Sequence, residues 1–336
     1  MNNISRLLPK ALDLELISLL RDWLPKTIID FHLHVHQDPS ESVFNDSAMK
    51  PSQSFNWFDL KLHKQVAKSF GLEEIDYRAV IFGLPFRHNE RENNLSLSKD
   101  FANNKSFYPI DCLTGGKSVS GSFSSGLGAR GIKTKIISKS ETSNVEIINN
   151  FSEKIWRELN DSKGFLVIHL PKNILDNLDE IIFLANKYRE INFIMAHMGG
   201  FFLFDEKLSQ ALEKVSKVPN IYFDTAMVVD PKVISCAIST LGCERILFGS
   251  DAPFGYMRGE FSKQGGQTRF YPDDYWPWDK DFLNRGVNTP HSMVVLNSIL
   301  AIKQGLDDCG ESNDYGKNSI FFNNAISILN GTRPSF

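Results

Sequence analysis

The sequence of 336 residues contains few cysteines and lacks the long apolar segments that mark membrane proteins. No stretch approaches the roughly 18 uncharged apolar residues that a membrane span needs. The N-terminal segment has helical periodicity but carries Lys10, Asp13 and Arg21, which a signal peptide would not tolerate. The four cysteines form no Cys-x-x-Cys pair, and so few thiols in a long chain are typical of a reducing compartment. We therefore expect a cytoplasmic protein.

The sequence also lacks an excess of charge of one sign. It has 37 lysines and arginines against 40 aspartates and glutamates, for a formal net charge of −3. A protein that binds nucleic acid through its charge needs a basic face, and a protein that binds an anionic membrane needs a polybasic patch. We expect neither nucleic acid nor membrane as a partner.

Three nucleotide or nucleophile motifs are missing or fail on their context. The segment 126–131 matches G-x-G-x-x-G, but a Ser/Gly-rich loop precedes it and a predicted strand follows, which indicates a turn. The segment 115–118 resembles the end of a phosphate-binding loop, but Asp111 stands where its first glycine belongs. No G-x-S-x-G nucleophile elbow is present.

Phenylalanine is the residue that the sequence has in excess. Its 26 phenylalanines, against eight tyrosines and five tryptophans, indicate a large apolar interior and an aromatic-lined cavity. The length fits either two domains or one α/β barrel. The sequence contains short apolar runs followed by helical patterns. Because such an order is typical of βαβ units and a parallel sheet, it favours the α/β barrel. We expect eight strands, at Thr27–His34, Ala79–Leu84, Phe107–Cys112, Gly131–Ile137, Phe165–Leu170, Asn192–His197, Asn220–Thr225 and Arg245–Asp251.

The spacing of the polar residues that end these strands is nearly constant. His169, His197, Asp224 and Asp251 follow one another at intervals of 28, 27 and 27 residues. One strand, one loop and one return helix need about that length. The pattern predicts an α/β fold, a single (β/α)8 TIM barrel, with a doubly wound open sheet as the alternative.

We expect residues 1–336 to form this one barrel domain. Residues 1–26 would be an N-terminal helical extension, and 306–336 would supply a C-terminal helix that closes the barrel. Two long aromatic-rich loops, at 35–58 and 252–289, follow the first and eighth strands. In a barrel both loops emerge at the catalytic face, so we expect their aromatic side chains to line the substrate pocket.

Candidate metal ligands stand at the ends of several predicted strands. His32 and His34 are two residues apart, which places both side chains on one face of the first strand, with Asp30 on that face as well. An H-x-H pair alone is weak support for a metal site. In a closed barrel, however, Asp251 on the eighth strand lies beside the first strand, and His169 lies across the mouth. Because these side chains converge, we favour a metal site over the alternative that each histidine is a core residue with its own hydrogen-bond partner.

Ordered motifs along the chain now resemble a known family. They are IIDFHLHVH, GIKTK, VIHL, IMAHMGG, NIYFDTA, ILFGSDAPFG and the final helix SIFFNNAISIL, and they run from about residue 28 to 329. The set resembles the amidohydrolase superfamily, in the amidohydrolase-related branch of metal-dependent hydrolases and decarboxylases. H-x-H is unspecific by itself, whereas AHMGG and FGSDAP in this order are specific.

The resemblance implies a (β/α)8 barrel that holds one divalent metal ion, most often zinc. The metal ligands that it implies are His32, His34, His169 and Asp251. His197 would stand beside the metal and polarise the substrate or position the water. In relatives with two metals a carboxylated lysine is the bridge, and Lys133 occupies that position here. The branch usually holds one metal, so we favour one ion over two.

These ligands imply a chemistry. A divalent metal lowers the pKa of bound water, Asp251 would accept the proton of that water, and His197 would stabilise the oxyanion. We expect an enzyme, a metal-dependent hydrolase of a small amide, ester or lactone substrate. The alternatives are a non-oxidative decarboxylase of a small unsaturated or aromatic carboxylate, and a non-catalytic barrel that retains the metal as a binding protein. Barrels of this branch are often dimers, so a homodimer is among the expectations.

Further residues are weaker candidates. Arg87 and His88, after the second strand, lie on the expected rim and are interpreted as contacts for a substrate carboxylate. His36 is either a loop residue or a substrate contact. Asp224 either faces the site or makes a structural hydrogen bond. His63 stands in a charged helical stretch and is expected to face water.

Overall fold

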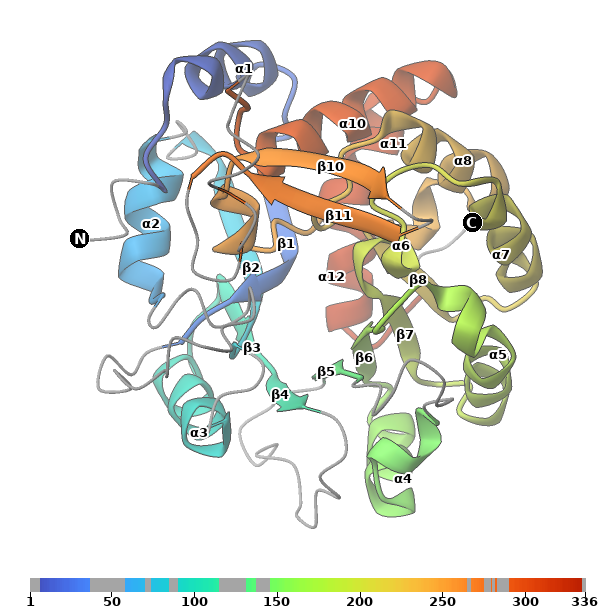
Figure 1. The fold of residues 1–336 in the computed structure, drawn as a ribbon. Helices are drawn as coiled ribbons and strands as arrows, with labels where there is room; N and C mark the ends of the chain where they lie inside the picture. The colour runs from blue at the N-terminus through green and yellow to red at the C-terminus, as the bar shows by residue number, and fades with distance from the viewer. Residues whose placement is uncertain are drawn as a thin grey trace.

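In a computed structural model, parallel strands alternate with helices that surround them (Figure 1). The structure describes residues 7–36, 58–69, 74–84, 90–114, 131–136, 146–264, 267–274, 279, 282 and 290–333. The parallel strands are β1 (Thr27–His34), β2 (Asp76–Phe82), β3 (Phe107–Pro109), β4 (Asp111–Thr114), β5 (Gly131–Lys135), β6 (Phe165–His169), β7 (Asn192–Met195), β8 (Ile221–Asp224) and β9 (Ile246–Leu247).

Backbone hydrogen bonds close these strands into a barrel. Neighbouring strands pair in parallel from β1 to β3 and from β4 to β9. Between the two groups, the amide of Ile110 donates to the carbonyl of Ile81 at 2.9 Å. Beyond β9, the amide of Phe31 donates to the carbonyl of Phe248 at 2.8 Å, which joins the last strand to the first. The predicted (β/α)8 barrel is confirmed.

The third predicted strand, Phe107–Cys112, is divided in two. Pro109 is the last residue of β3 and has no amide hydrogen to donate to the ladder. After Ile110 the chain changes partner, so that β3 pairs with β2 and β4 pairs with β5. The prediction of one continuous strand is therefore wrong in detail, while its place in the barrel order holds.

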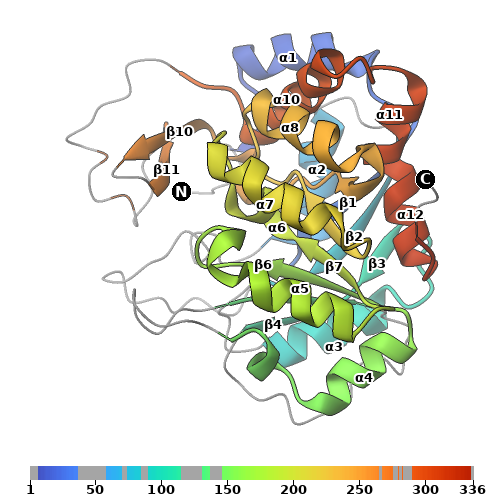
Figure 2. The same cartoon turned by 90° about the vertical axis from the view of Figure 1, so that its right-hand side faces the viewer.

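Helices cover the outside of the barrel (Figures 1 and 2). The longer ones are α1 (Ala11–Arg21), α2 (Leu60–Ser69), α3 (Glu90–Asp100), α4 (Glu153–Asp161), α5 (Leu178–Lys187), α7 (Glu206–Ser216), α8 (Pro231–Leu241) and α10 (Val294–Asp308). The shorter turns are η6 (Ile148–Asn150), η7 (Ile174–Asn177), α6 (Ala196–Gly200), η8 (Cys243–Arg245), η9 (Phe254–Tyr256), α11 (Asp314–Asn318), η10 (Ser319–Asn323) and α12 (Asn324–Leu329).

Helix α8 illustrates how local sequence sets the bounds of these helices. The side chain of Asp230 accepts a hydrogen bond from the amide of Lys232, and Pro231 occupies the first helical position. Gly242 ends the helix with φ 79°, a left-handed conformation that glycine adopts at little cost. Within these bounds the helix buries its apolar face, on Val233, Ile234, Ala237, Ile238 and Leu241.

Two apolar layers hold the barrel together. One fills its interior, where Phe31 and Phe165 pack with ring centroids 5.1 Å apart. The other lies between the strands and the surrounding helices. At the N-terminal end of the strands, Ala325 and Ile328 of α12 join the interior layer, and Asn324 donates to two backbone carbonyls of the η8–β9 segment at 2.8 Å. Helix α12 thus closes this end of the barrel.

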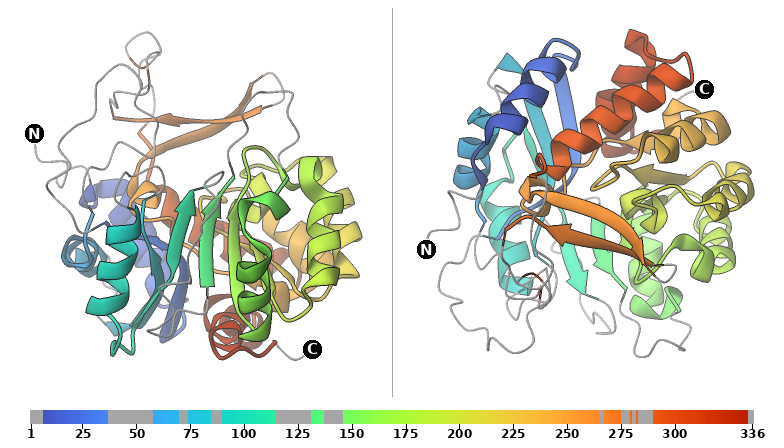
Figure 3. Two further views of the ribbon diagram at one scale, coloured as in Figure 1. Left: turned by 90° about the horizontal axis from the view of Figure 1, so that it is seen from below. Right: turned by 45° about the horizontal axis from the view of Figure 1, so that its top comes forward.

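A β-hairpin lies across the opposite end. Its strands are β10 (Gly259–Gln264) and β11 (Gln267–Pro272), which pair antiparallel, and Figures 2 and 3 show it at the end of the barrel away from α12. It forms part of the predicted loop 252–289. The prediction of a loop throughout this stretch is therefore wrong in part. Of the other long loop, 35–58, only residues 35–36 and 58 belong to the described residues.

The N-terminal helix is tied to the barrel by a buried ion pair. Arg258 donates through Nε to Asp13 Oδ2 at 2.9 Å, and both side chains are almost fully buried. The other oxygen of Asp13 accepts the amide of Met293 at 2.7 Å. Asp13 therefore joins α1 to the two ends of the segment that carries the hairpin. No helix in the described ranges is long and apolar enough to cross a membrane.

We predict that Asp13→Ala lowers the free energy of unfolding by about 3–5 kcal/mol, because it removes the carboxylate that balances the buried charge of Arg258. The measurement is urea unfolding. The control is Asp176→Ala, which removes an exposed pair with Lys172 and should change this free energy by less than about 1 kcal/mol. Equal effects of the two substitutions would contradict the prediction.

Candidate metal centre

A bulge in β1 decides which side chains face the inside of the barrel mouth. Asp30 pairs with Ala79 and Leu33 with Ile81, so two residues of β1 stand opposite one residue of β2. Simple alternation predicted Asp30 on the same face as His32. That prediction is wrong, because the bulge reverses the alternation between them. Asp30 instead points to the outside of the barrel wall, where its carboxylate accepts the hydroxyl of Tyr77.

His32 lies at the centre of the polar cluster. Its Nδ1 is 2.8 Å from Asp224 Oδ2, and both side chains are fully buried. Its Nε2 is 3.2 Å from Asp251 Oδ1 and 3.0 Å from the Nζ atom of Lys133. Because an ionised carboxylate only accepts hydrogen bonds, Asp224 holds the proton of the neutral ring on Nδ1, and Nε2 carries the lone pair.

His34 has the same arrangement with a different partner. Its Nδ1 is 2.8 Å from the backbone carbonyl of Gly83. A carbonyl can only accept, so the proton is on Nδ1 and the lone pair of the neutral ring is on Nε2. This Nε2 is 3.2 Å from Asp251 Oδ1, the oxygen that also faces His32. The Nε2 atoms of His32 and His34 therefore converge on one carboxylate oxygen.

His169 and His197 contact each other at the ends of β6 and β7. His197 Nε2 is 2.9 Å from His169 Nδ1, and His197 Nδ1 is 2.9 Å from the carbonyl of Ala226. The carbonyl again places the proton of His197 on Nδ1, so its Nε2 presents a lone pair. The rings of His32 and His197 are 5.0 Å apart between centroids.

The backbone at His197 and Asp251 is left-handed, with φ values of 56° and 53°. Non-glycine residues in this region cost about 1–3 kcal/mol each and are concentrated at functional sites. Hydrogen bonds hold both positions, since the amide of His197 donates to Asp224 Oδ1 and the amide of Asp251 donates to the carbonyl of His32, each at 2.8 Å. Glycine is required at 249 because a Cβ there would lie 2.8 Å from the Cβ of His32.

Burial and charge set the protonation states of the cluster. Burial lowers the pKa of His32, His169 and His197, so all three rings are neutral at neutral pH. Burial alone would raise the pKa of Asp251, but the adjacent His32, His34 and His197 lower it well below its usual value, and the carboxylate stays ionised. Burial lowers the pKa of Lys133 to about 8.

This donor set fits a divalent cation. His32, His197 and Asp251 each place one ligand atom within 4.8 Å of the others. Lone pairs of neutral imidazoles and an ionised carboxylate that face one another repel unless positive charge lies among them. Lys133 supplies part of that charge next to His32. Imidazole nitrogen and carboxylate oxygen are ligands typical of zinc and similar borderline ions.

Aromatic rings line the approach to the cluster. Phe254 meets the ring of His34 edge-on, with centroids 5.5 Å apart. Phe202 stacks on His197 at 5.3 Å, and Phe261 of the hairpin stacks on Phe202 at 5.0 Å. The ammonium group of Lys263 in β10 lies 3.1 Å from Asp205 and fixes the hairpin against the loop before α7.

Most of the sequence-predicted site residues meet at this mouth. They are His32, His34, Lys133, His169, His197 and Asp251. His36 lies beyond β1, where its backbone pairs with Phe58. Arg87 and His88 lie outside the described residues. Asp224 contacts two of the site histidines, a role the sequence left open, and Asp30 was assigned to the wrong face.

Comparison with known proteins gives one family match, over part of the chain. Residues 126–274 match the family model described as amidohydrolase. None of the curated proteins matches the chain. This family match covers under half of the chain and agrees with the ordered motifs, so the chain is similar to the amidohydrolase family. The similarity to amidohydrolases indicates an enzyme.

Solved structures share the fold at low sequence identity. Amidohydrolase 2 from Bifidobacterium longum subsp. infantis is 15% identical, with a TM-score of 0.53 over 91% of this chain and 99% of that one. An amidohydrolase from Burkholderia multivorans is 10% identical, with a TM-score of 0.56 over 92% and 100%. The 2,6-dihydroxybenzoate decarboxylase from Rhizobium is 12% identical, with a TM-score of 0.53 over 91% and 99%. The shared barrel spans nearly the whole of each chain.

We predict that Asp224→Asn weakens the binding of Zn²⁺ about 10- to 100-fold, because the amide cannot accept from both His32 and the amide of His197. Calorimetric titration of the metal-free protein measures the affinity. Asp314→Asn is the control, since Asp314 is an exposed carboxylate that faces Lys317 on α11. Equal affinities of the two variants would contradict the prediction.

Proposed function

We propose that the protein is a metal-dependent hydrolase that uses an activated water on a small amide, ester or lactone. The observation that carries this proposal is the convergence of His32 Nε2 and His34 Nε2 on one oxygen of Asp251, each at 3.2 Å. The position supports it as well, because the cluster lies at the C-terminal mouth of the barrel, where enzymes of this fold have their active sites.

The proposed ion is a single Zn²⁺ held by His32, His34, His169 and Asp251. The lone pair of His197 Nε2, beside His169, makes His197 a further candidate ligand. When bound, such an ion polarises a substrate oxygen and lowers the pKa of water. Lys133 stands where a carboxylated lysine would bridge a second ion, and in the unmodified form it donates to His32.

Asp251 is the proposed general base. Its lowered pKa keeps it ionised at neutral pH, so it can accept a proton from the attacking water and then donate it to the leaving group. The left-handed backbone at this residue holds the carboxylate toward His32 and His34 and away from its own strand.

The hydrogen bond between His197 Nδ1 and the carbonyl of Ala226 argues for a different role of His197 from the one that the motifs implied. The motif resemblance implied that His197 stabilises an oxyanion, which needs a hydrogen on the nitrogen that faces the substrate. The carbonyl of Ala226 holds the proton of the neutral ring on Nδ1, and burial lowers the pKa of the ring. His197 Nε2 is therefore suited to bind a cation or accept a proton, and oxyanion stabilisation would require the ring to gain a second proton.

The aromatic wall supports a partly apolar substrate. Phe202 and Phe261 form a stack that extends from His197 to the hairpin, so a planar acyl or ring group can pack beside it. The hairpin reaches over the mouth and would limit the entry of water.

A second function, decarboxylation of a small unsaturated or aromatic carboxylate, is favoured by two lysines of β5. Lys133 lies within the cluster, and Lys135 is paired with His169 in the register of β5 and β6. Two cationic groups beside an apolar wall suit an aromatic carboxylate. Assays of lactone and ester hydrolysis, run beside assays of CO₂ release, separate the two reactions.

We predict that Asp251→Asn lowers kcat about 10²- to 10⁴-fold while the fold is retained, because the amide cannot accept the proton. Asp314→Asn, at an exposed carboxylate on α11, is the matched control and should keep the wild-type rate. Circular dichroism checks the fold. A wild-type rate for the Asp251 variant would show that another group is the base.

We expect purified protein to contain about one divalent ion per chain, the stoichiometry typical of a single catalytic zinc site. Elemental analysis after metal-supplemented expression provides the measurement. A metal content near zero would refute the proposed function, and a content near two would indicate that Lys133 bridges a second ion.

A further inference from the structure

One carboxylate outside the metal centre joins the two strands that carry its ligands. Asp30 Oδ1 accepts the amide of His32 and the amide of Ser250, each at 2.9 Å. One amide belongs to β1 and the other to the segment after β9. These two parts of the chain lie side by side where the barrel closes, and we call this junction the seam. A single buried oxygen thus links the residue His32 itself to the residue that precedes Asp251.

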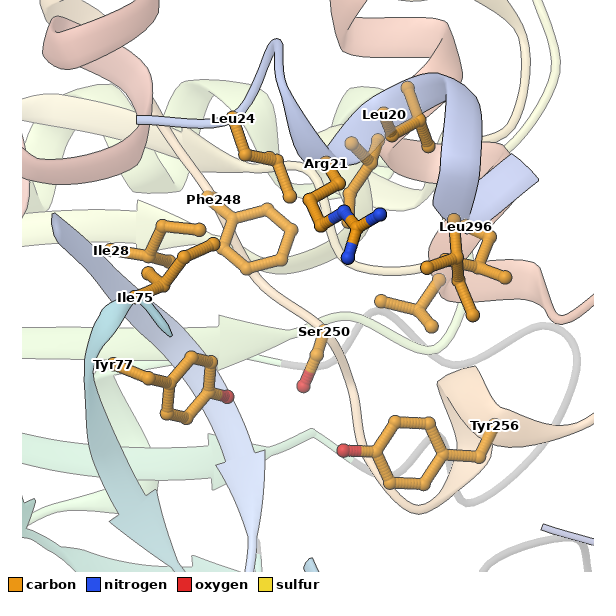
Figure 4. Close-up of a pocket in the computed structure, with 13 residues that line it drawn as sticks. Leu20, Arg21, Leu24, Ile28, Ile75, Tyr77, Phe248, Ser250, Tyr256 and Leu296 are labelled. Atoms are coloured by element: carbon orange, nitrogen blue, oxygen red, sulfur yellow. The ribbon is translucent and has the colours of Figure 1, made fainter. Parts of the chain in front are cut away.

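The second oxygen of Asp30 is held from the outer wall. Tyr77 donates its hydroxyl to Oδ2 at 2.5 Å. Burial raises the pKa of Tyr77, so the hydroxyl remains a donor. Figure 4 shows the hydroxyls of Tyr77, Ser250 and Tyr256 turned toward one another at the edge of a largely apolar pocket between the barrel wall, α1 and α10. Both oxygens of Asp30 are therefore fixed.

His63 completes this outer cluster. Its Nδ1 is 2.9 Å from the hydroxyl of Tyr256, and the side chain is buried. The expectation that His63 faces water is wrong, because α2 turns this residue toward the barrel wall along with Leu62 and Val66. The cluster lies on the opposite side of β1 from the metal centre, so Asp30 does not touch the proposed metal or substrate position.

The amide pair that Asp30 holds is part of a closed set of hydrogen bonds. His32 donates to Asp30 through its amide and accepts the amide of Asp251 through its carbonyl at 2.8 Å. Ser250, next in sequence to Asp251, returns to Asp30. The left-handed backbone of Asp251 is unfavourable by itself and persists only where surrounding contacts impose it. Asp30 supplies one of those contacts.

We propose that Asp30 is a positioning residue that holds His32 and Asp251 side by side at the geometry that metal binding requires. This inference rests on the proposed metal-dependent function. Without the carboxylate, the amides of His32 and Ser250 are buried donors without partners, and the seam between β1 and the segment after β9 loses the contact that fixes its register.

The test compares Asp30→Ala with Tyr77→Phe. We expect Asp30→Ala to weaken Zn²⁺ binding to the metal-free protein about 10- to 100-fold, the usual effect of removing a group that orients metal ligands. Tyr77→Phe removes the hydroxyl that contacts Oδ2 and the side chain of Ser250, keeps both amide contacts of Oδ1, and should stay within about threefold of wild type. A role in stability alone would lower the thermal midpoint of Asp30→Ala but leave the affinity of the folded protein unchanged, and that result would overturn the proposal.

Two further measurements keep the test decisive. If Asp30→Ala does not fold, Asp30→Leu replaces it, because leucine fills a similar space and accepts neither amide. Affinity within about twofold of wild type in that variant would overturn the proposal. Hydrogen exchange of the metal-free protein is the second readout, and we expect exchange of the Ser250 and Asp251 amides to rise about tenfold in the Asp30 variant.

The exchange readout separates this inference from the proposed function. If the wild-type protein binds no Zn²⁺, the proposed function fails. If, in addition, the amides of residues 250–251 exchange at the same rate in the Asp30 variant as in the wild type, Asp30 does not hold the seam. If the wild type binds Zn²⁺ and the Asp30 variants bind it equally well, only the positioning role is overturned.

Discussion

The barrel mouth depends on the buried carboxylate of Asp224. An ionised carboxylate inside a protein is unfavourable unless hydrogen bonds replace its water. Asp224 obtains them from the ring of His32, the amide of His197 and the amide of Ala226. These bonds fix the tautomer of one histidine and the left-handed backbone of another. The positions of the lone pairs that face Asp251 follow from this arrangement.

The barrel order was readable from the sequence, while its local departures were not. Apolar runs at regular intervals mark strands wherever both faces are buried, as they are in β6 and β7. The division of the third strand depends on which neighbour Ile110 contacts, and chain periodicity carries no information about neighbours. The β10–β11 hairpin was missed because one of its faces is open, so its alternation is weak.

The sequence predicted a site residue correctly where its position at the end of a strand was enough to place it at the barrel mouth. His169, His197 and Asp251 end strands of one barrel, and closure brings them together whatever their side-chain directions. Asp30 was misplaced because a bulge of one residue moves every later side chain to the other face. The preference of His197 for a proton on Nδ1 depends on the carbonyl of Ala226, which is 29 residues away in sequence. Such a contact exists only in the folded chain.

The β10–β11 hairpin contributes to the approach to the polar cluster but not to the cluster itself. Its base is fixed by the ion pair of Arg258 with Asp13 and by His291, which lies 2.7 Å from Asp273. Its outer strands carry Phe261, beside the pocket, but none of the metal-centre residues. Substitutions along these strands can therefore reshape what enters the pocket while the reacting groups stay in place. A change of substrate by this route would leave the barrel and its polar cluster unaltered during evolution.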